Sequence, residues 1–336
     1  MNKHSASQDV CRSASHPVQA DLPQGDSFLH SELETTSHAS HGLINSSLPS
    51  TKIKLSLSQL TTMRWSLADE LPHLKALGFE GIGLWRPKVS EIGEEAAAEM
   101  IRDADVGVAS LSFVGGFTGR NGFSYRDAVA DGRDAILDAA LLGAENVIVV
   151  GGSRNFHTVA HCRRLVTQAL GELSEFAMLH GVKLSLLPML NFFSPTWTFL
   201  HTLDETLDLL RQINHPSVGL AFDTYHLWRE PRLIERIPQL VPLTNVVQIS
   251  DSRRAPQTDS DRCFPGEGRI PLTDIVRKFQ HAGYAGYFDL QVWSDEGWAK
   301  SSEEVSRLCR DSVQRFNSTT GNSTADATLS VLSNTL

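Results

Sequence analysis

The chain has few cysteines and no long apolar run. Its 336 residues include four cysteines, Cys11, Cys162, Cys263 and Cys309, and none of them forms a C-x-x-C pair. This spacing argues against a zinc ribbon or a disulfide framework and predicts reduced thiols in a cytoplasmic protein. No run of 18 apolar residues occurs, so we expect no membrane-spanning helix. The N-terminus also lacks the apolar core of a secretory signal.

Positive charge is scarce as well. Lys and Arg number 30 against 39 Asp and Glu, which gives a formal net charge of −9. Nucleic-acid binding needs a basic surface, so the composition argues against such a partner. The segment after the first predicted strand, Gln59–Thr62, is not a glycine-rich phosphate turn. We therefore predict no nucleotide cofactor.

Hydrophobic periodicity is absent from both ends of the chain. Residues 1–50 are rich in Ser, His, Thr and Gln with scattered Pro, a composition typical of a disordered extension. Residues 317–336 are similarly polar and are predicted to form a disordered tail. About 41% of the chain is hydrophobic, which suffices for one large domain over residues 51–316.

Between these ends, short apolar segments alternate with helix-like segments. Helices are predicted at residues 66–77, 90–104, 125–142, 159–180, 203–213 and 302–315. Strands are predicted at residues 53–57, 81–85, 108–114, 146–150, 182–187, 218–222, 245–249 and 287–292. This pattern matches the α/β fold of a (β/α)8 TIM barrel in number and size. A doubly wound open sheet is the alternative, but it would require the phosphate turn that the chain lacks.

The strand ends are where the site is expected, because chemistry in a TIM barrel takes place at the carboxyl ends of the strands. The sixth predicted strand ends in Phe222, and Asp223 and His226 follow in an Asp-x-x-His segment. Such a segment can place a metal ligand and a polar partner at the mouth of a barrel. Asp289 lies two residues before Gln291 and shares its inward face in a regular strand.

Five segments together resemble the xylose-isomerase-like barrel superfamily. This superfamily includes sugar-phosphate isomerases and epimerases, hydroxypyruvate isomerase, inosose dehydratase, 3-dehydroshikimate dehydratase and endonuclease IV. The segments are Leu184–Met189, Phe222–His226, Val247–Asp251, Arg262–Gly268 and Gly286–Gln291, and each ends or follows a predicted strand. The resemblance covers residues 51–316 and implies a TIM barrel.

The resemblance also implies a divalent metal, such as Mg²⁺, Mn²⁺, Zn²⁺ or Co²⁺. Family members hold it with Glu after strand five, Asp after strand six, His or Gln after strand seven and Glu after strand eight. Here those positions carry Leu187, Asp223, Gln248 and Gln291. Asp223 and Gln248 keep the expected ligand types, whereas Leu187 and Gln291 replace the glutamates. We expect a degenerate metal site, because affinity for hard divalent ions follows the number of charged oxygen ligands.

Other side chains are candidates for catalysis and substrate binding. Asp223 and His226 are the predicted catalytic pair, because the pKa of an ordinary histidine lies close to neutral pH. Arg262 precedes a Pro-Gly-Glu-Gly turn and is suited to bind a carboxylate or phosphate. The predicted substrate-binding residues are Gln248, Gln291, Arg254, Arg262, Glu267 and Trp85.

For function, the resemblance implies a sugar or sugar-phosphate isomerase or epimerase, acting on a small sugar or a hydroxy-keto acid. Neither Leu187 nor Gln291 can act as a general base, so the family mechanism does not carry over whole. One alternative is a non-catalytic barrel that binds a small molecule, and another is a lyase or dehydratase of the same superfamily. A nuclease would need a cluster of His and acidic ligands that the strand ends do not supply. The expected partner is a small-molecule substrate, and homo-oligomerisation stays open.

Overall fold

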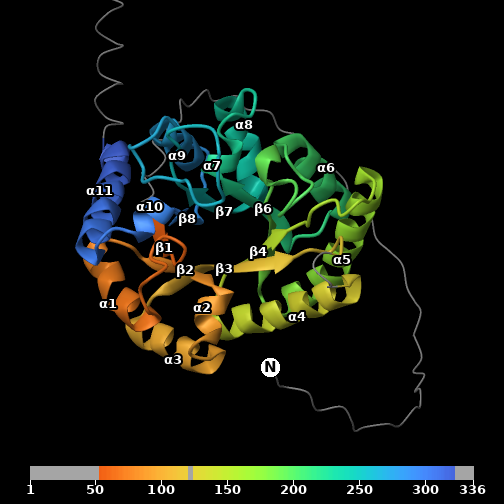
Figure 1. Cartoon of the computed structure of the whole chain (residues 1–336), viewed down its shortest axis with the longest axis horizontal. Coiled ribbons are helices and arrows are strands. Elements are labelled where there is room, and N and C mark those ends of the chain that lie inside the picture. Colours follow the sequence, from red (N-terminus) through yellow and green to blue (C-terminus); the bar gives the residue numbers. More distant parts are fainter. Residues whose placement is uncertain (1–52, 120–123, 322–336) are drawn as a thin grey trace, which may run out of the picture. The chain divides into compact units, whose positions relative to one another are not determined.

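The chain forms a ring of eight parallel strands surrounded by helices (Figure 1). The computed structural model describes residues 53–119 and 124–321. The predicted extension at residues 1–50 lies outside the described residues, as does the predicted tail beyond residue 321. The strands are β1 (Lys54–Ser58), β2 (Gly81–Trp85), β3 (Gly107–Gly115), β4 (Asn146–Val150), β5 (Lys183–Leu186), β6 (Val218–Asp223), β7 (Thr244–Ile249) and β8 (Tyr287–Leu290).

The sheet closes on itself. Each strand pairs in parallel with the next strand along the chain. The ring is closed by β1 and β8, in a register that places Leu55 beside Phe288. This closure confirms the predicted (β/α)8 barrel and excludes the doubly wound open sheet. The carboxyl ends of all eight strands therefore meet at one mouth.

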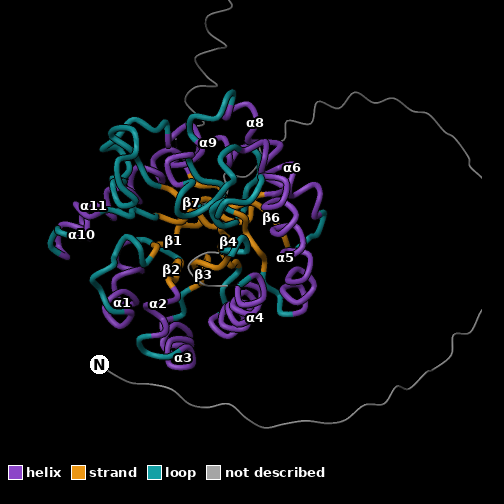
Figure 2. The backbone as a smooth tube through the Cα atoms, turned by 45° about the vertical axis from the view of Figure 1, so that its right-hand side comes forward, coloured by secondary structure: helices purple, strands orange, loops and turns teal. Residues whose placement is uncertain are grey.

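Helices cover the outer face of the barrel (Figure 2). The helical elements are α1 (Leu67–Leu77), α2 (Arg86–Ser90), α3 (Glu94–Ala104), α4 (Tyr125–Leu142), α5 (Val159–Leu179), α6 (Leu203–Ile213), α7 (Thr224–Leu227), α8 (Leu233–Leu240), α9 (Leu272–His281), α10 (Asp295–Trp298) and α11 (Ser302–Gly321), with the 3₁₀ turns η1 (Asn191–Phe193) and η2 (Val241–Leu243). None of the helices in the described ranges is long and apolar enough to cross a membrane.

Local capping signals fix where several helices begin. The side chains of Ser66, Ser124 and Thr202 each accept the backbone N–H of the third residue of the following helix. In all three cases the third residue bonds back to the cap, which forms a capping box and satisfies two backbone donors at once. Gly143 ends α4 with a φ of 73°, a left-handed conformation that glycine adopts without steric cost.

The helices differ from the sequence prediction in several respects. The helix predicted over residues 90–104 begins at Glu94, because Gly93 has a φ of +87° and separates α3 from the short helix α2 at residues 86–90, which was not predicted. The last helix, α11, continues to Gly321 and does not end at residue 315. The helices α8 and α9 were not predicted. The single-turn helices α7 and α10 were not predicted either, since four residues carry too little periodicity to be read from sequence.

The interior of the barrel has an apolar half and a polar half. Along β4, Val147 and Val149 belong to the main core, whereas Ile148 and Val150 belong to a second, smaller cluster. Alternate residues of a strand point to opposite faces, so the smaller cluster lies on the inner face. Its fully buried members are Ile148, Val150, Leu187, Met189, Phe193, Ala221, Tyr225 and Val246. The buried polar residues of β1, β6, β7 and β8 form the other half of the interior and define the candidate site.

Candidate functional site

The end of β6 runs directly into a helical turn that carries two of the predicted site residues. Asp223 is the last residue of β6 and the N-cap of α7, and its Oδ1 accepts the Tyr225 backbone N–H at 2.8 Å. His226 lies in the same turn. Asp223 is 0% and His226 is 3% exposed. The Asp-x-x-His segment therefore places a carboxylate and an imidazole together inside the barrel mouth.

Arg262 joins these two side chains into one cluster. Its Nη1 donates to Asp223 Oδ2 at 2.7 Å, and its Nη2 lies 3.1 Å from His226 Nε2. Nη1 also lies 3.3 Å from Ser250 Oγ, and the guanidinium stacks 4.7 Å from the centre of the Tyr225 ring. Arg262 is buried, and the Asp223–His226–Arg262 cluster forms a charge-assisted network shielded from solvent.

The surroundings of His226 set its protonation state. Burial, together with the nearby Arg262 charge, lowers the pKa of His226 to about 3, although Asp223 opposes the shift. Both ring nitrogens face N–H donors, because the Leu190 backbone N–H lies 3.4 Å from Nδ1. A neutral imidazole accepts at one nitrogen only, and the shorter contact from Arg262 assigns the lone pair to Nε2. This arrangement favours a role for His226 in holding the guanidinium in place.

Two glutamines adjoin the cluster and leave hydrogen-bonding groups unpaired. Gln248 lies on β7 in register with Asp223, and Gln291 follows β8. They are 0% and 1% exposed. Within the described part of the chain, Gln248 Nε2 and Oε1, Gln291 Oε1 and Arg262 Nε have no hydrogen-bond partner. A buried polar group without a partner costs about 1–3 kcal/mol, so these atoms call for a bound molecule or water.

Asp289 lies on the same inner face. Its neighbours in register are Gln248 on β7 and Ser56 on β1, and Ser56 Oγ donates to it at 2.7 Å. Room for the carboxylate comes from Gly83 on β2, where a Cβ atom would lie 2.7 Å from Asp289 Oδ2. Burial raises the pKa of Asp289 to about 6, and the charge of Asp223 adds to the shift. Asp289 therefore exchanges its proton closer to neutral pH than an ordinary aspartate.

Leu187 follows β5, the strand next to β6, and belongs to the apolar wall of the mouth. It is 1% exposed and belongs to the apolar inner cluster with Met189 and Phe193. Its backbone N–H donates to Val149 O at 2.9 Å and continues the ladder beyond β5. The position that holds a glutamate in the implied metal site is thus an apolar wall.

A divalent metal does not fit this set of side chains. Both oxygens of Asp223 already accept hydrogen bonds, from Tyr225 N–H and from Arg262. A dication bound to Asp223 would lie roughly 4 Å from the guanidinium, where repulsion amounts to about 8 kcal/mol at an effective dielectric constant of about 20. Gln248 and Gln291 offer neutral amides, which cannot offset that charge. In residues 53–119 and 124–321, no group of three or more His, Cys, Asp or Glu side chains is placed to hold a metal ion.

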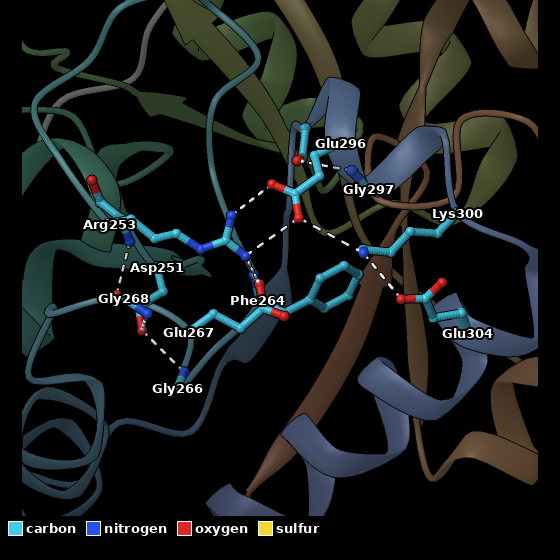
Figure 3. Close-up of polar contacts among 12 residues, drawn as sticks. Asp251, Arg253, Phe264, Gly266, Glu267, Gly268, Glu296, Gly297, Lys300 and Glu304 are labelled. Atoms are coloured by element: carbon cyan, nitrogen blue, oxygen red, sulfur yellow. Dashed lines mark hydrogen bonds and ion pairs between the residues drawn. The ribbon is translucent and has the colours of Figure 1, made fainter.

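Asp251 organises the loop that carries Arg262 (Figure 3). Its Oδ2 accepts the N–H groups of Gly266 and Gly268, and its Oδ1 accepts those of Ser252 and Ile270. Its backbone also pairs with Cys263, the residue after Arg262. One carboxylate therefore fixes the Pro-Gly-Glu-Gly turn and, through it, the position of the guanidinium.

A chain of ion pairs on the outside of this loop ties it to the helices that follow β8. Arg253 contacts Glu267 at 2.7 Å and Glu296 at 2.6 Å, and Lys300 contacts Glu304 at 3.0 Å (Figure 3). Glu267 is thus engaged with Arg253 and not with the buried cluster. Arg254, next along the chain, is exposed and lines a cleft of about 330 Å³ together with Arg262. The substrate-binding role predicted for Glu267 and Arg254 stays a prediction.

Aromatic side chains meet across the mouth. Phe113 of β3, Trp197 after η1 and Trp293 after β8 have ring centroids 5.6–6.3 Å apart. A cleft of about 630 Å³ opens on the β3–β4 side and is lined by Phe113 and Trp197. Trp85, predicted to bind substrate, is half-buried at the end of β2, and its backbone N–H donates to Gln59 Oε1 at 2.9 Å.

Sequence reasoning did not identify some of the supporting residues. Lys88 and Glu70 form a buried ion pair at 2.5 Å beneath the loop after β1, and Gln59 bonds the same carboxylate. Tyr225, whose hydroxyl bonds Asp261, packs against the guanidinium. The Tyr225 position was visible in the Asp-x-x-His segment. No local signal pointed to the Lys88–Glu70 pair, because its partners are 18 residues apart.

Comparison with known proteins assigns the chain to a family. A family model described as "Xylose isomerase-like TIM barrel" matches residues 71–312. The chain belongs to this family. An inosose isomerase from Bacillus velezensis is 22% identical over 273 residues, which cover 78% of this chain and 96% of the relative.

Solved structures agree with the assignment to the xylose isomerase-like TIM barrel family. Protein SMc04130 from Sinorhizobium meliloti 1021 is 26% identical with a TM-score of 0.72, and the match covers 77% of this chain and 97% of that one. A second structure, described as the IOLI protein with a binding zinc atom, is 20% identical with a TM-score of 0.69 and covers 79% and 99%. The zinc is a feature of that protein, and at this identity the likeness shows the fold alone.

Proposed function

We propose that this barrel binds a small, uncharged polyhydroxylated ketone at its mouth, between Gln248, Gln291 and Arg262. The observation that carries the proposal is the set of buried donor and acceptor atoms on these three side chains that have no partner among the described residues. A carboxamide offers both donors and an acceptor, and a hydroxyl group offers the same combination. A polyol can therefore satisfy Gln248 completely, which an apolar ligand cannot.

The charge balance of the site supports an uncharged ligand. The positive charge of Arg262 is paired with Asp223, both glutamines are neutral, and the low pKa of His226 keeps the imidazole neutral. A phosphate or carboxylate group would have to compete with Asp223 for the guanidinium. The apolar inner wall around Leu187 complements the C–H faces of a sugar-sized ring.

The second candidate function is isomerase or epimerase activity on this ketone. Such reactions move a proton on the carbon next to a carbonyl, and they need a base that titrates near neutral pH. Asp289 is the buried carboxylate on the inner face whose pKa, about 6, suits that task. The name of the inosose isomerase relative agrees with this class of substrate. A non-catalytic binding barrel and a lyase or dehydratase are the alternatives that the experiments below separate.

Binding is tested by isothermal titration calorimetry with an inosose, a ketohexose and the phosphate ester of that ketohexose. We expect the uncharged ketones to bind more tightly than the ester. Gln248→Leu should weaken binding at least roughly tenfold, the equivalent of about 1.4 kcal/mol, whereas Arg211→Met on the exposed face of α6 should leave it unchanged. Tighter binding of the ester, or equal binding by Gln248→Leu, would contradict the proposal.

Catalysis is tested separately by proton NMR in D₂O. An isomerase or epimerase exchanges the hydrogen next to the carbonyl for solvent deuterium, so the wild-type protein should wash out that signal and Asp289→Asn should not. Binding without exchange in the wild type would instead support the non-catalytic barrel. Release of water with formation of a conjugated product would point to the dehydratase.

A further inference from the structure

Several contacts fix the guanidinium of Arg262 in place. Asp223 and Ser250 engage Nη1, His226 engages Nη2, and the Tyr225 ring covers one face of the guanidinium. The Arg262 backbone N–H donates to Trp293 O at 3.2 Å, which anchors the loop beside β8. The side chain is 5% exposed, so its charge cannot move out to solvent without breaking all of these contacts.

Arg262 contacts the carboxylate that the family resemblance assigns to a metal ion. Asp223 occupies the position of the metal-ligating aspartate, and its Oδ2 bonds the guanidinium. The two positions that hold glutamates carry Leu187 and Gln291, which removes two negative charges from the site. Without the two glutamates, the charge of Asp223 is balanced by the guanidinium alone, which leaves the cluster close to neutral. The substitutions and the arginine contact are therefore consistent with one another.

We infer that the guanidinium of Arg262 is the resident cation of this barrel, and that its free Nε–H, with the Gln248 carboxamide, binds the carbonyl oxygen of the ligand. Nε is buried and unpartnered among the described residues, as are both polar atoms of the Gln248 side chain. A fixed N–H of a charged group stabilises negative charge that develops on an oxygen, as a metal ion does. The part of this inference that concerns the ligand rests on the proposed function, whereas the part that concerns the metal does not.

The metal part is tested by titrating the full-length, metal-stripped protein with Mn²⁺ and following free Mn²⁺ by electron paramagnetic resonance. Manganese suits the test because it prefers carboxylate ligands to imidazole, and the chain has 13 histidines. Asp223→Asn is the matched control, since it removes the carboxylate at the site and leaves every histidine in place. We expect wild type and Asp223→Asn to bind the same amount. One equivalent of Mn²⁺ bound tightly by the wild type and lost in Asp223→Asn would overturn the inference.

The ligand part is tested by calorimetry with the ketone that binds best. Stripping metal with EDTA should leave wild-type affinity unchanged. Arg262→Lys, which keeps the charge but loses the planar fork, should weaken binding at least tenfold, whereas Arg211→Met on the exposed face of α6 should not. Affinity that needs added metal, or that survives Arg262→Lys, overturns the inference while the proposed function stands. If no uncharged ketone binds, the proposed function fails, and the manganese titration still decides the metal question.

Discussion

The buried pair of Asp223 and Arg262 allows a quantitative test of the site's architecture. The two side chains are 0% and 4% exposed, and their N–O distance is 2.7 Å. Removing one partner of such a pair leaves the other charge buried and uncompensated, which costs about 3–5 kcal/mol. We therefore expect Arg262→Met to lower the free energy of unfolding by about 3–5 kcal/mol. Asp223→Asn should cost a similar amount, since the guanidinium then lacks its counter-charge.

The double variant separates the pair from other effects of the two substitutions. With both charges removed, neither is left unpaired, so Asp223→Asn with Arg262→Met should be more stable than the sum of the single changes predicts. A coupling of about 2–3 kcal/mol is expected, within the range measured for residues in one buried network. The measurement is urea-induced unfolding at pH 7, with the transition followed by circular dichroism.

Arg253→Met is the matched control in the same loop. Arg253 is 45% exposed and pairs with Glu267 and Glu296 at the surface, so its loss should cost no more than about 1 kcal/mol. If Arg262→Met costs as little as Arg253→Met, or if the effects of the two buried substitutions simply add, then the Asp223–Arg262 pair does not organise the mouth as described.

Three further predictions concern residues beneath the cluster. Gly83→Ala would bring a Cβ to 2.7 Å from the Asp289 carboxylate and should lower the free energy of unfolding by about 1–3 kcal/mol. The control is Gly171→Ala in α5, where a Cβ meets nothing within 4 Å, and it should stabilise the protein. Equal effects of the two variants in urea unfolding would refute the close contact at Gly83. Folding raises the pKa of Asp289 from 3.8 to about 6, so its favourable contribution to stability is complete below pH 3.8 and is lost as the pH rises through 6. Relative to Asp289→Asn, the wild type should lose about 2.5 kcal/mol between pH 4 and pH 7. The same pH dependence for wild type and Asp289→Asn would contradict this. Lys88→Met leaves the Glu70 carboxylate buried without its cation and should cost about 3 kcal/mol in thermal or urea unfolding, so a loss below about 1 kcal/mol would show that the pair is not a structural one.

Much of the fold could be predicted from local sequence signals. Apolar runs such as Asn146–Val150 marked the strands, and the helices predicted to start at residues 66 and 125 begin at Leu67 and Tyr125. These signals suffice because each element depends on its own side chains. The break at Gly93 was missed, since a glycine in a helical pattern does not reveal its φ.

The site could be predicted in part only. The strand ends drew attention to Asp223, Gln248 and Arg262, which the barrel brings to one mouth. Sequence could not show that Arg262 is paired with Asp223, because the two residues are 39 positions apart and meet only when the loop after β7 folds back. It also could not show that burial lowers the pKa of His226 to about 3. The pKa of a histidine is set by its neighbours in space, and these come from separate elements.

The most direct test of the account is a crystal structure of the protein with the best-binding uncharged ketone. We predict density for the ligand in the polar half of the mouth, with hydrogen bonds from Gln248 and from Arg262 Nε, and with the Asp223–Arg262 contact intact. A ligand found in the β3–β4 cleft, with Gln248 bonded to water alone, would contradict the account, as would a metal ion on Asp223 with Arg262 displaced.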